Sequence, residues 1–164
     1  MREADIIRQA FTSLLGRPIW KVRKGHGSFL TFDFQVLPAG EPEGAAAQTD
    51  PWHLWIYCCQ WRLLIGERIA ADSNAVGEDI TGAAQELTGY CLLDVGSDPS
   101  RGTSRFFFER RAVLETWPYP TDTAELWPSD QDQWLLYAPG NRVFTYAADG
   151  HAWWQAGAKS EPTT

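Results

Sequence analysis

Hydrophobic and polar positions alternate with a period of two along much of this chain, which predicts strands more often than helices. The segment 28–36 shows the pattern most clearly. Its apolar set is Leu30, Phe32, Phe34 and Val36, and its other set is Phe29, Thr31 and Asp33. A second alternating segment at 19–24 precedes it, and Gly25, His26 and Gly27 form a turn signal between the two. The two segments therefore predict a β-hairpin.

Two segments have helical spacing instead. Over residues 3–15 the apolar positions are Ile6, Ile7, Ala10, Phe11 and Leu14, and Gly16 and Pro18 follow as stop signals. Residues 72–89 form the second predicted helix, with Ser73 or Asn74 as its cap and Gly89 at its end.

The remaining alternating segments predict further strands, joined mainly by turns. They lie at 52–60, 61–70, 91–95, 103–109, 112–117, 133–138, 142–147 and 151–155. No Gly or Pro separates the first two, which suggests a bend between them. Eight to ten strands joined by turns predict an α+β fold, with a curved, mostly antiparallel sheet or a partly closed β-barrel. The two helices are expected to pack together on one face or end of it.

The length favours one domain over residues 1–156. Residues 37–51 are rich in Pro, Gly, Ala, Glu and Thr, which predicts a mobile loop. Residues 157–164 predict a flexible tail.

The segment 52–65 holds three of the nine tryptophans within ten residues and predicts the central strands. Strand alternation divides it into two sets. Trp52, Leu54, Ile56, Cys58 and Gln60 form the expected core face. His53, Trp55, Tyr57, Cys59 and Trp61 form the other, which is either a second core layer or a contact surface.

Charge is distributed unevenly along the chain. The net charge is −7, with +4 over residues 1–32 and −11 over residues 33–164. An acidic protein repels nucleic acid and attracts a basic partner, although plain solubility explains the same charge. Neither a membrane span nor a signal peptide is evident. Three cysteines are an odd set for a disulfide framework, so a reducing cytoplasm is expected.

Candidate chemistry is sparse. The Cys and His residues have no metal-ligand spacing, and no phosphate-binding glycine motif is present, so neither a metal nor a cofactor is expected. Cys58 and Cys59 are expected to be buried, because their surroundings are apolar. His26 lies between two glycines and could approach Asp33 across the hairpin as a general base, although a polar turn residue is the simpler interpretation.

Two runs carry a family resemblance. Residues 16–34 (GRPIWKVRKGHGSFLTFDF), residues 52–62 (WHLWIYCCQWR) and a later WLLY element at 134–137 resemble small bacterial domains, some of which are grouped with immunity proteins of polymorphic toxin systems. The resemblance implies a compact cytosolic α+β domain and assigns no functional residues.

Three functions follow as hypotheses. The first is a non-enzymatic, immunity-like or host–phage conflict protein that neutralises a protein partner, with Trp55, Tyr57, Trp61, His26 and Asp33 as candidate contacts. The second is a small-molecule or peptide pocket within the sheet, lined by Trp55, Trp61 and Phe residues. The third is a small hydrolase-type enzyme that uses His26.

Overall fold

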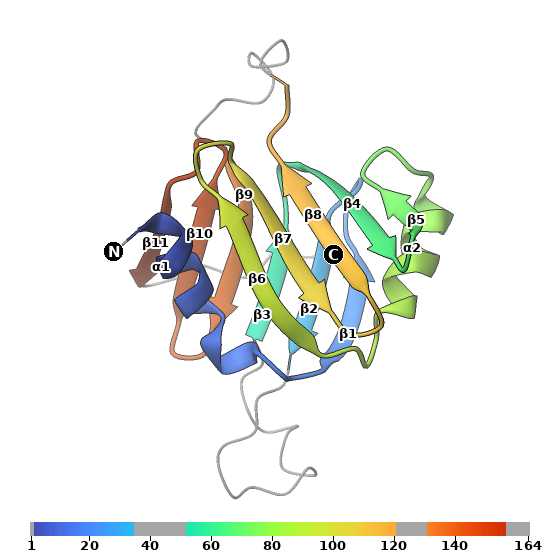
Figure 1. The fold of residues 1–164 in the computed structure, drawn as a ribbon, viewed down its shortest axis with the longest axis horizontal. Coiled ribbons are helices and arrows are strands. Elements are labelled where there is room, and N and C mark those ends of the chain that lie inside the picture. Colours follow the sequence, from blue (N-terminus) through green and yellow to red (C-terminus); the bar gives the residue numbers. More distant parts are fainter. Residues whose placement is uncertain (1, 35–51, 121–130, 157–164) are drawn as a thin grey trace, which may run out of the picture.

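Two antiparallel sheets and two α-helices make up the computed structural model, which describes residues 2–34, 52–120 and 131–156. One sheet lies behind the other (Figure 1). The six-stranded sheet has the order β1 (Ile19–Lys24), β2 (Leu30–Phe34), β3 (Trp52–Ile56), β9 (Asp132–Ala138), β10 (Arg142–Ala147) and β11 (Ala152–Ala156). The five-stranded sheet has the order β5 (Arg68–Asp72), β4 (Gln60–Ile65), β8 (Ala112–Trp117), β7 (Thr103–Phe108) and β6 (Leu92–Asp98).

The predicted α+β class and antiparallel pairing are confirmed, but the strands are divided between two sheets, and the described residues form no closed barrel. The chain passes from one sheet to the other at residues 57–59, where the predicted bend is found. The predicted strand 61–70 is in fact the hairpin of β4 and β5, which turns at Gly66 with a φ of 65°. This split raises the number of strands in the described chain to eleven.

The helices lie on opposite sides of the sheet pair, and not together on one face or end. Helix α1 (Glu3–Ala10) packs against β6 and β11, and α2 (Gly77–Glu86) packs against β1 and β5. Each helix therefore covers edge strands of both sheets (Figure 1). This placement protects backbone groups at the sheet edges, which would otherwise be open to pairing with other chains.

Both helices are shorter than predicted. The first continues beyond α1 only as a 3₁₀ turn at Thr12–Leu14. The second begins after Val76, without a side-chain cap. The predicted cap residues act elsewhere, because the Ser73 hydroxyl accepts a hydrogen bond from the Trp61 backbone N–H and the Asn74 N–H donates to Asp72. Local hydrogen bonding thus extends the hairpin at the expense of the helix.

Buried aromatic side chains fill the space between the sheets and connect them. Trp134 in β9 is fully buried, and its indole N–H donates to the Ser104 hydroxyl in β7 at 2.9 Å. The Tyr146 hydroxyl in β10 donates to the Thr103 carbonyl at 3.1 Å. Each bond joins one sheet to the other and satisfies a polar atom that burial would otherwise leave unpaired.

Two predicted segments, the mobile loop at 37–51 and the flexible tail at 157–164, lie outside the described residues.

Glycine at position 150 permits a close approach of two backbone segments. Its φ is 87°, and a Cβ atom there would lie 2.0 Å from the Pro99 carbonyl oxygen. Gly140 has a similar φ of 83° but open space around the equivalent position.

We expect Gly140→Ala to cost about 1 kcal/mol of unfolding free energy through backbone strain alone. We expect Gly150→Ala to cost at least about 2 kcal/mol more, because the backbone must also shift. Urea unfolding of both variants measures the difference, and equal losses would contradict the close approach.

Candidate functional site

The outer face of the six-stranded sheet carries charged, polar and aromatic side chains, some of them half-exposed and others buried. Strand pairing aligns them in two rows that cross the sheet. The first row is Lys21, Asp33, His53, Tyr137, Val143 and Gln155. The second row is Arg23, Thr31, Trp55, Leu135, Thr145 and Trp153. Alternate residues of the same strands, such as Phe32 and Leu54, are fully buried between the sheets, so the two rows face outward.

A charged trio lies at the β1 side of this face. Asp33 Oδ1 is 2.6 Å from His53 Nδ1, and Arg23 Nη2 donates to Asp33 Oδ2 at 3.2 Å. An ionised carboxylate only accepts hydrogen bonds, so His53 Nδ1 carries the proton that it donates. Asp33 is only 3% exposed, and these two partners offset the cost of burying its charge. The contacts fix the orientations of the imidazole and the guanidinium.

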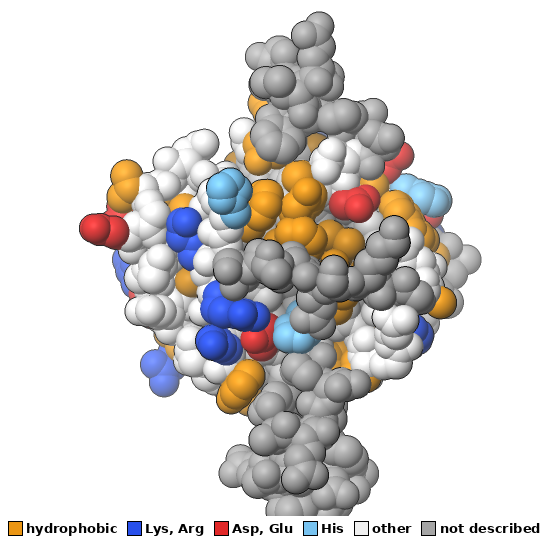
Figure 2. All heavy atoms as spheres, turned by 180° about the vertical axis from the view of Figure 1, so that it is seen from behind, with side chains coloured by type: hydrophobic (Ala, Val, Ile, Leu, Met, Phe, Trp, Pro, Cys, Tyr) orange, Lys and Arg blue, Asp and Glu red, His pale blue; other side chains and the backbone are white. Residues whose placement is uncertain are grey.

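An aromatic cluster of Phe29, Trp55 and Tyr57 lies beside the trio. The Trp55 and Tyr57 ring centroids are 4.2 Å apart, and the Phe29 ring is 4.7 Å from Tyr57 and 5.9 Å from Trp55. All three side chains are half-buried. Figure 2 shows hydrophobic side chains gathered on this face, with Lys and Arg side chains beside them. The three rings support one another and still present apolar surface to solvent.

Two threonines of the second row have unused hydrogen-bonding capacity. Thr31 is 4% exposed and Thr145 is 1% exposed. The hydroxyl oxygens of both are buried and have no hydrogen-bond partner within the described part of the chain. Such groups are uncommon in folded proteins, because an unpaired buried polar group costs free energy.

The structure brings most of the predicted site residues to this face. Trp55, Tyr57 and Asp33 lie on it, and His26 is exposed in the β1–β2 turn with its ring 6.5 Å from that of Phe29. Trp61 does not belong there. It lies in β4 of the other sheet, is 1% exposed, and donates its indole N–H to the Ser28 carbonyl.

The prediction that His26 approaches Asp33 across the hairpin is wrong. Asp33 lies opposite Lys21, three pairs along the hairpin from the final pair of Lys24 and Leu30, whereas His26 is in the turn. The histidine that contacts Asp33 is His53, which the pairing of β2 with β3 places directly opposite it. The sequence pattern placed His53 only on the second face of the segment 52–65 and assigned it no partner. Alternation placed Asp33 and His53 on the faces of their predicted strands that do not form the expected core, and this was the signal in the sequence that could have suggested the pair.

The three cysteines are all free thiols, and Cys58 and Cys59 are buried. Burial raises the pKa of both thiols, which disfavours the thiolate form that a nucleophile or metal ligand requires. Among the described residues, no group of three or more His, Cys, Asp or Glu side chains could hold a metal ion. Of the helices in the described ranges, none is long and apolar enough to cross a membrane.

Comparisons of this chain with protein-family models, with curated proteins and with solved structures found no match. The outer face is therefore interpreted from its own geometry.

Removal of the buried carboxylate is expected to be costly. Asp33→Ala leaves Arg23 and His53 without their shared acceptor, and we expect a loss of about 3 kcal/mol in unfolding free energy. Glu86→Ala is the matched control, because its ion pair with Arg68 at 2.8 Å is largely exposed and should contribute less than about 1 kcal/mol. Denaturant unfolding near neutral pH measures both. Similar losses in the two variants would show that the trio contributes nothing beyond a surface ion pair.

Proposed function

We propose that this chain is a non-enzymatic protein-binding domain, and that the outer face of the six-stranded sheet is its contact surface. The observation that carries the proposal is the half-exposed cluster of Phe29, Trp55 and Tyr57. Tryptophan and tyrosine are frequent energetic anchors of protein interfaces, since they bury a large area with few rotatable bonds. Trp55 lies on a central strand, so little conformational entropy is lost when it is covered.

The charged trio supports the same role. Asp33 fixes the orientations of Arg23 and His53, so the trio is a rigid charged feature at the edge of an apolar surface. A hydrophobic centre with a polar rim is the usual arrangement of a protein interface.

The proposed basic character of the partner rests on sequence segments outside the described face. The described residues contain thirteen Lys and Arg against fourteen Asp and Glu, and are nearly neutral. Residues 35–51 and 121–130 contain three acidic residues each and no Lys or Arg. Electrostatic attraction of a basic partner would therefore come from these segments and weaken as salt increases, whereas aromatic burial on the outer face would not.

An immunity-like role in the cytoplasm, in which the chain neutralises a protein toxin, is the form of this proposal that the family resemblance favours. Rapid electrostatic capture followed by aromatic burial suits such a role. Products of genes adjacent to the one that encodes this chain are the first partners to test.

The contact between Asp33 and His53 favours a second candidate function, general-base catalysis of hydrolysis. A carboxylate that accepts from one ring nitrogen orients the imidazole and stabilises its protonated form. If this function holds, His53→Ala abolishes turnover of an activated ester, whereas His26→Ala leaves it unchanged. Equal rates for both variants and the parent protein would exclude His53 as the base.

Truncation of Trp55 provides the central test of partner binding. With a purified partner, we expect Trp55→Ala to weaken binding by at least about 30-fold in isothermal titration, the usual effect of removing an interface anchor. Trp117→Ala, on the outer face of the opposite sheet, is the matched control and should change the affinity less than about twofold. Circular dichroism verifies that both variants fold. Unchanged binding by Trp55→Ala, or equal losses in the two variants, would remove the outer face as the contact surface.

A further inference from the structure

The five-stranded sheet has a groove on its own outer face, far from the aromatic cluster. Its volume is about 530 Å³, and it lies over β6, β7 and β8. Gly96, Arg105, Phe107, Glu115 and Trp117 line it. The volume lies within the range of sites that hold small molecules.

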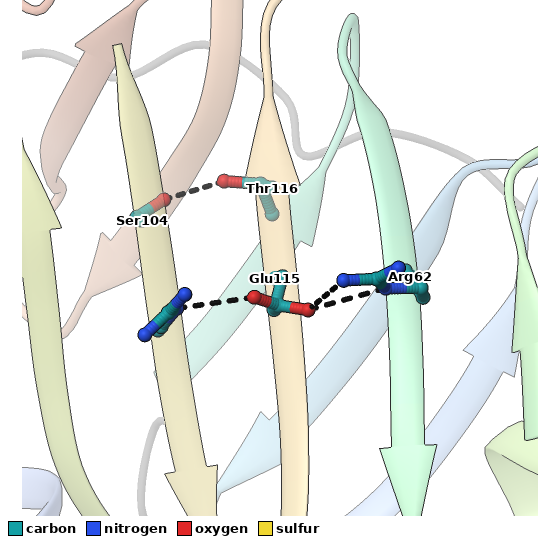
Figure 3. A network of polar contacts seen from close by, with 5 residues as sticks. Arg62, Ser104, Glu115 and Thr116 are labelled. Carbon is teal, nitrogen blue, oxygen red and sulfur yellow. Dashed lines mark hydrogen bonds and ion pairs between the residues drawn. The ribbon is translucent and has the colours of Figure 1, made fainter. Parts of the chain in front are cut away.

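A preorganised cation forms one wall of the groove. Glu115 is 14% exposed and lies between two arginines (Figure 3). Arg62 binds its Oε1 atom through Nε at 3.2 Å and Nη2 at 2.7 Å, and Arg105 binds its Oε2 atom through Nε at 3.1 Å. Two guanidinium groups therefore share one carboxylate, which leaves one positive charge in excess.

Arg105 is the arginine that can act on a ligand. Its side chain is 63% exposed, and within the described residues its ion pair with Glu115 uses Nε alone. The two terminal amino groups of the guanidinium are donors in a rigid planar fork, and the bond to Glu115 restricts how this fork can rotate. A carboxylate is the anion that matches such a fork through two parallel hydrogen bonds.

The opposite strand leaves space beside this cation. Gly96 in β6 pairs with Arg105, and a Cβ atom at position 96 would lie 3.6 Å from Phe107 Cε2. The absence of a side chain at 96 therefore opens the sheet surface directly beside Phe107 and Arg105. Trp117 lines the same groove, and its indole N–H is held by Gln60 Oε1 at 2.7 Å. The groove thus combines one surplus cation with two half-exposed aromatic side chains.

We propose that this groove binds a small aromatic carboxylate, with the carboxylate on the Arg105 guanidinium and the ring against Phe107 and Trp117 above Gly96. Asp98 and Arg101 also line the groove but form an ion pair of their own at 3.8 Å, so the excess beside Glu115 is one positive charge, which favours a monoanion over a phosphate dianion. The aromatic side chains favour a planar apolar group over an aliphatic one. This site is independent of the proposed protein-binding function, because it lies on the other sheet.

Titration with phenylacetate tests the proposal. We expect saturable binding with a Kd of about 0.1–1 mM, as suits a ligand of this size in an open groove. The readout is the indole N–H resonance of Trp117 in an amide correlation spectrum, assigned by its loss in Trp117→Phe. Phenylacetamide and acetate are the matched ligands: the first lacks the charge and the second lacks the ring, and both should bind at least about 10-fold more weakly.

Variants of the groove complete the test. Arg105→Gln removes the fork, and Gly96→Val fills the space with a residue that favours strands; each should weaken phenylacetate binding at least about 10-fold. Trp55→Ala on the opposite sheet should leave phenylacetate binding unchanged.

Binding by Arg105→Gln or by the neutral amide at the parent affinity would overturn the proposal, as would the absence of a saturable shift up to about 10 mM. A folded Gly96→Val variant that binds normally would place the ligand elsewhere. None of these outcomes depends on whether a protein partner is found for the other sheet.

Discussion

The burial of Trp134 is the interaction on which the rest of this structure depends. Its ring lies 5.6 Å from that of Phe11 after α1, 5.5 Å from Phe106 in β7 and 5.1 Å from Tyr146 in β10, so a helix and both sheets meet at one side chain. Its indole N–H would be left unpaired in the core without Ser104, which lies on the opposite sheet. The sheets must therefore pack at one distance and orientation for the hydrogen bond to form.

This central packing also determines what the outer faces can present. Strand β3 pairs with β9, and Ile56 lies opposite Trp134 in that ladder. Because Ile56 and Leu54 point into the core, the residues between them must point outward. Trp55 is thus placed on the surface by the buried residues that flank it. The same logic applies to β8, where buried Leu114 and Thr116 direct Glu115 outward between Arg62 and Arg105. Both candidate sites are consequences of a two-sided sheet pair with one shared core.

Several features were accessible from pattern alone, and others were not. The alternation over 28–36 correctly separated Phe32 and Phe34 from Asp33, because the side-chain period of a strand is a local property. The same rule failed for Trp61, since it assumed a continuous strand through residues 57–59. The bend there carries Trp61 into the core of the second sheet. The start of α2 was misplaced for a related reason, because Ser73 and Asn74 serve the β4–β5 hairpin instead of capping a helix.

The sequence by itself determined the class of fold, most of the strands, the two faces of β2 and β3, and the aromatic character of the segment around Trp55, because each of these follows from residues close together in the chain. Only the tertiary structure decided which strands are neighbours. It paired β2 with β3 and so placed His53, not His26, against Asp33, and it paired β4 with β8 and β8 with β7 and so placed Glu115 between two arginines. These pairings join residues from 10 to 53 positions apart, so the sequence around one residue does not determine which residue lies opposite it. Their register depends on how the whole core packs, which is why both candidate sites emerged only from the folded chain.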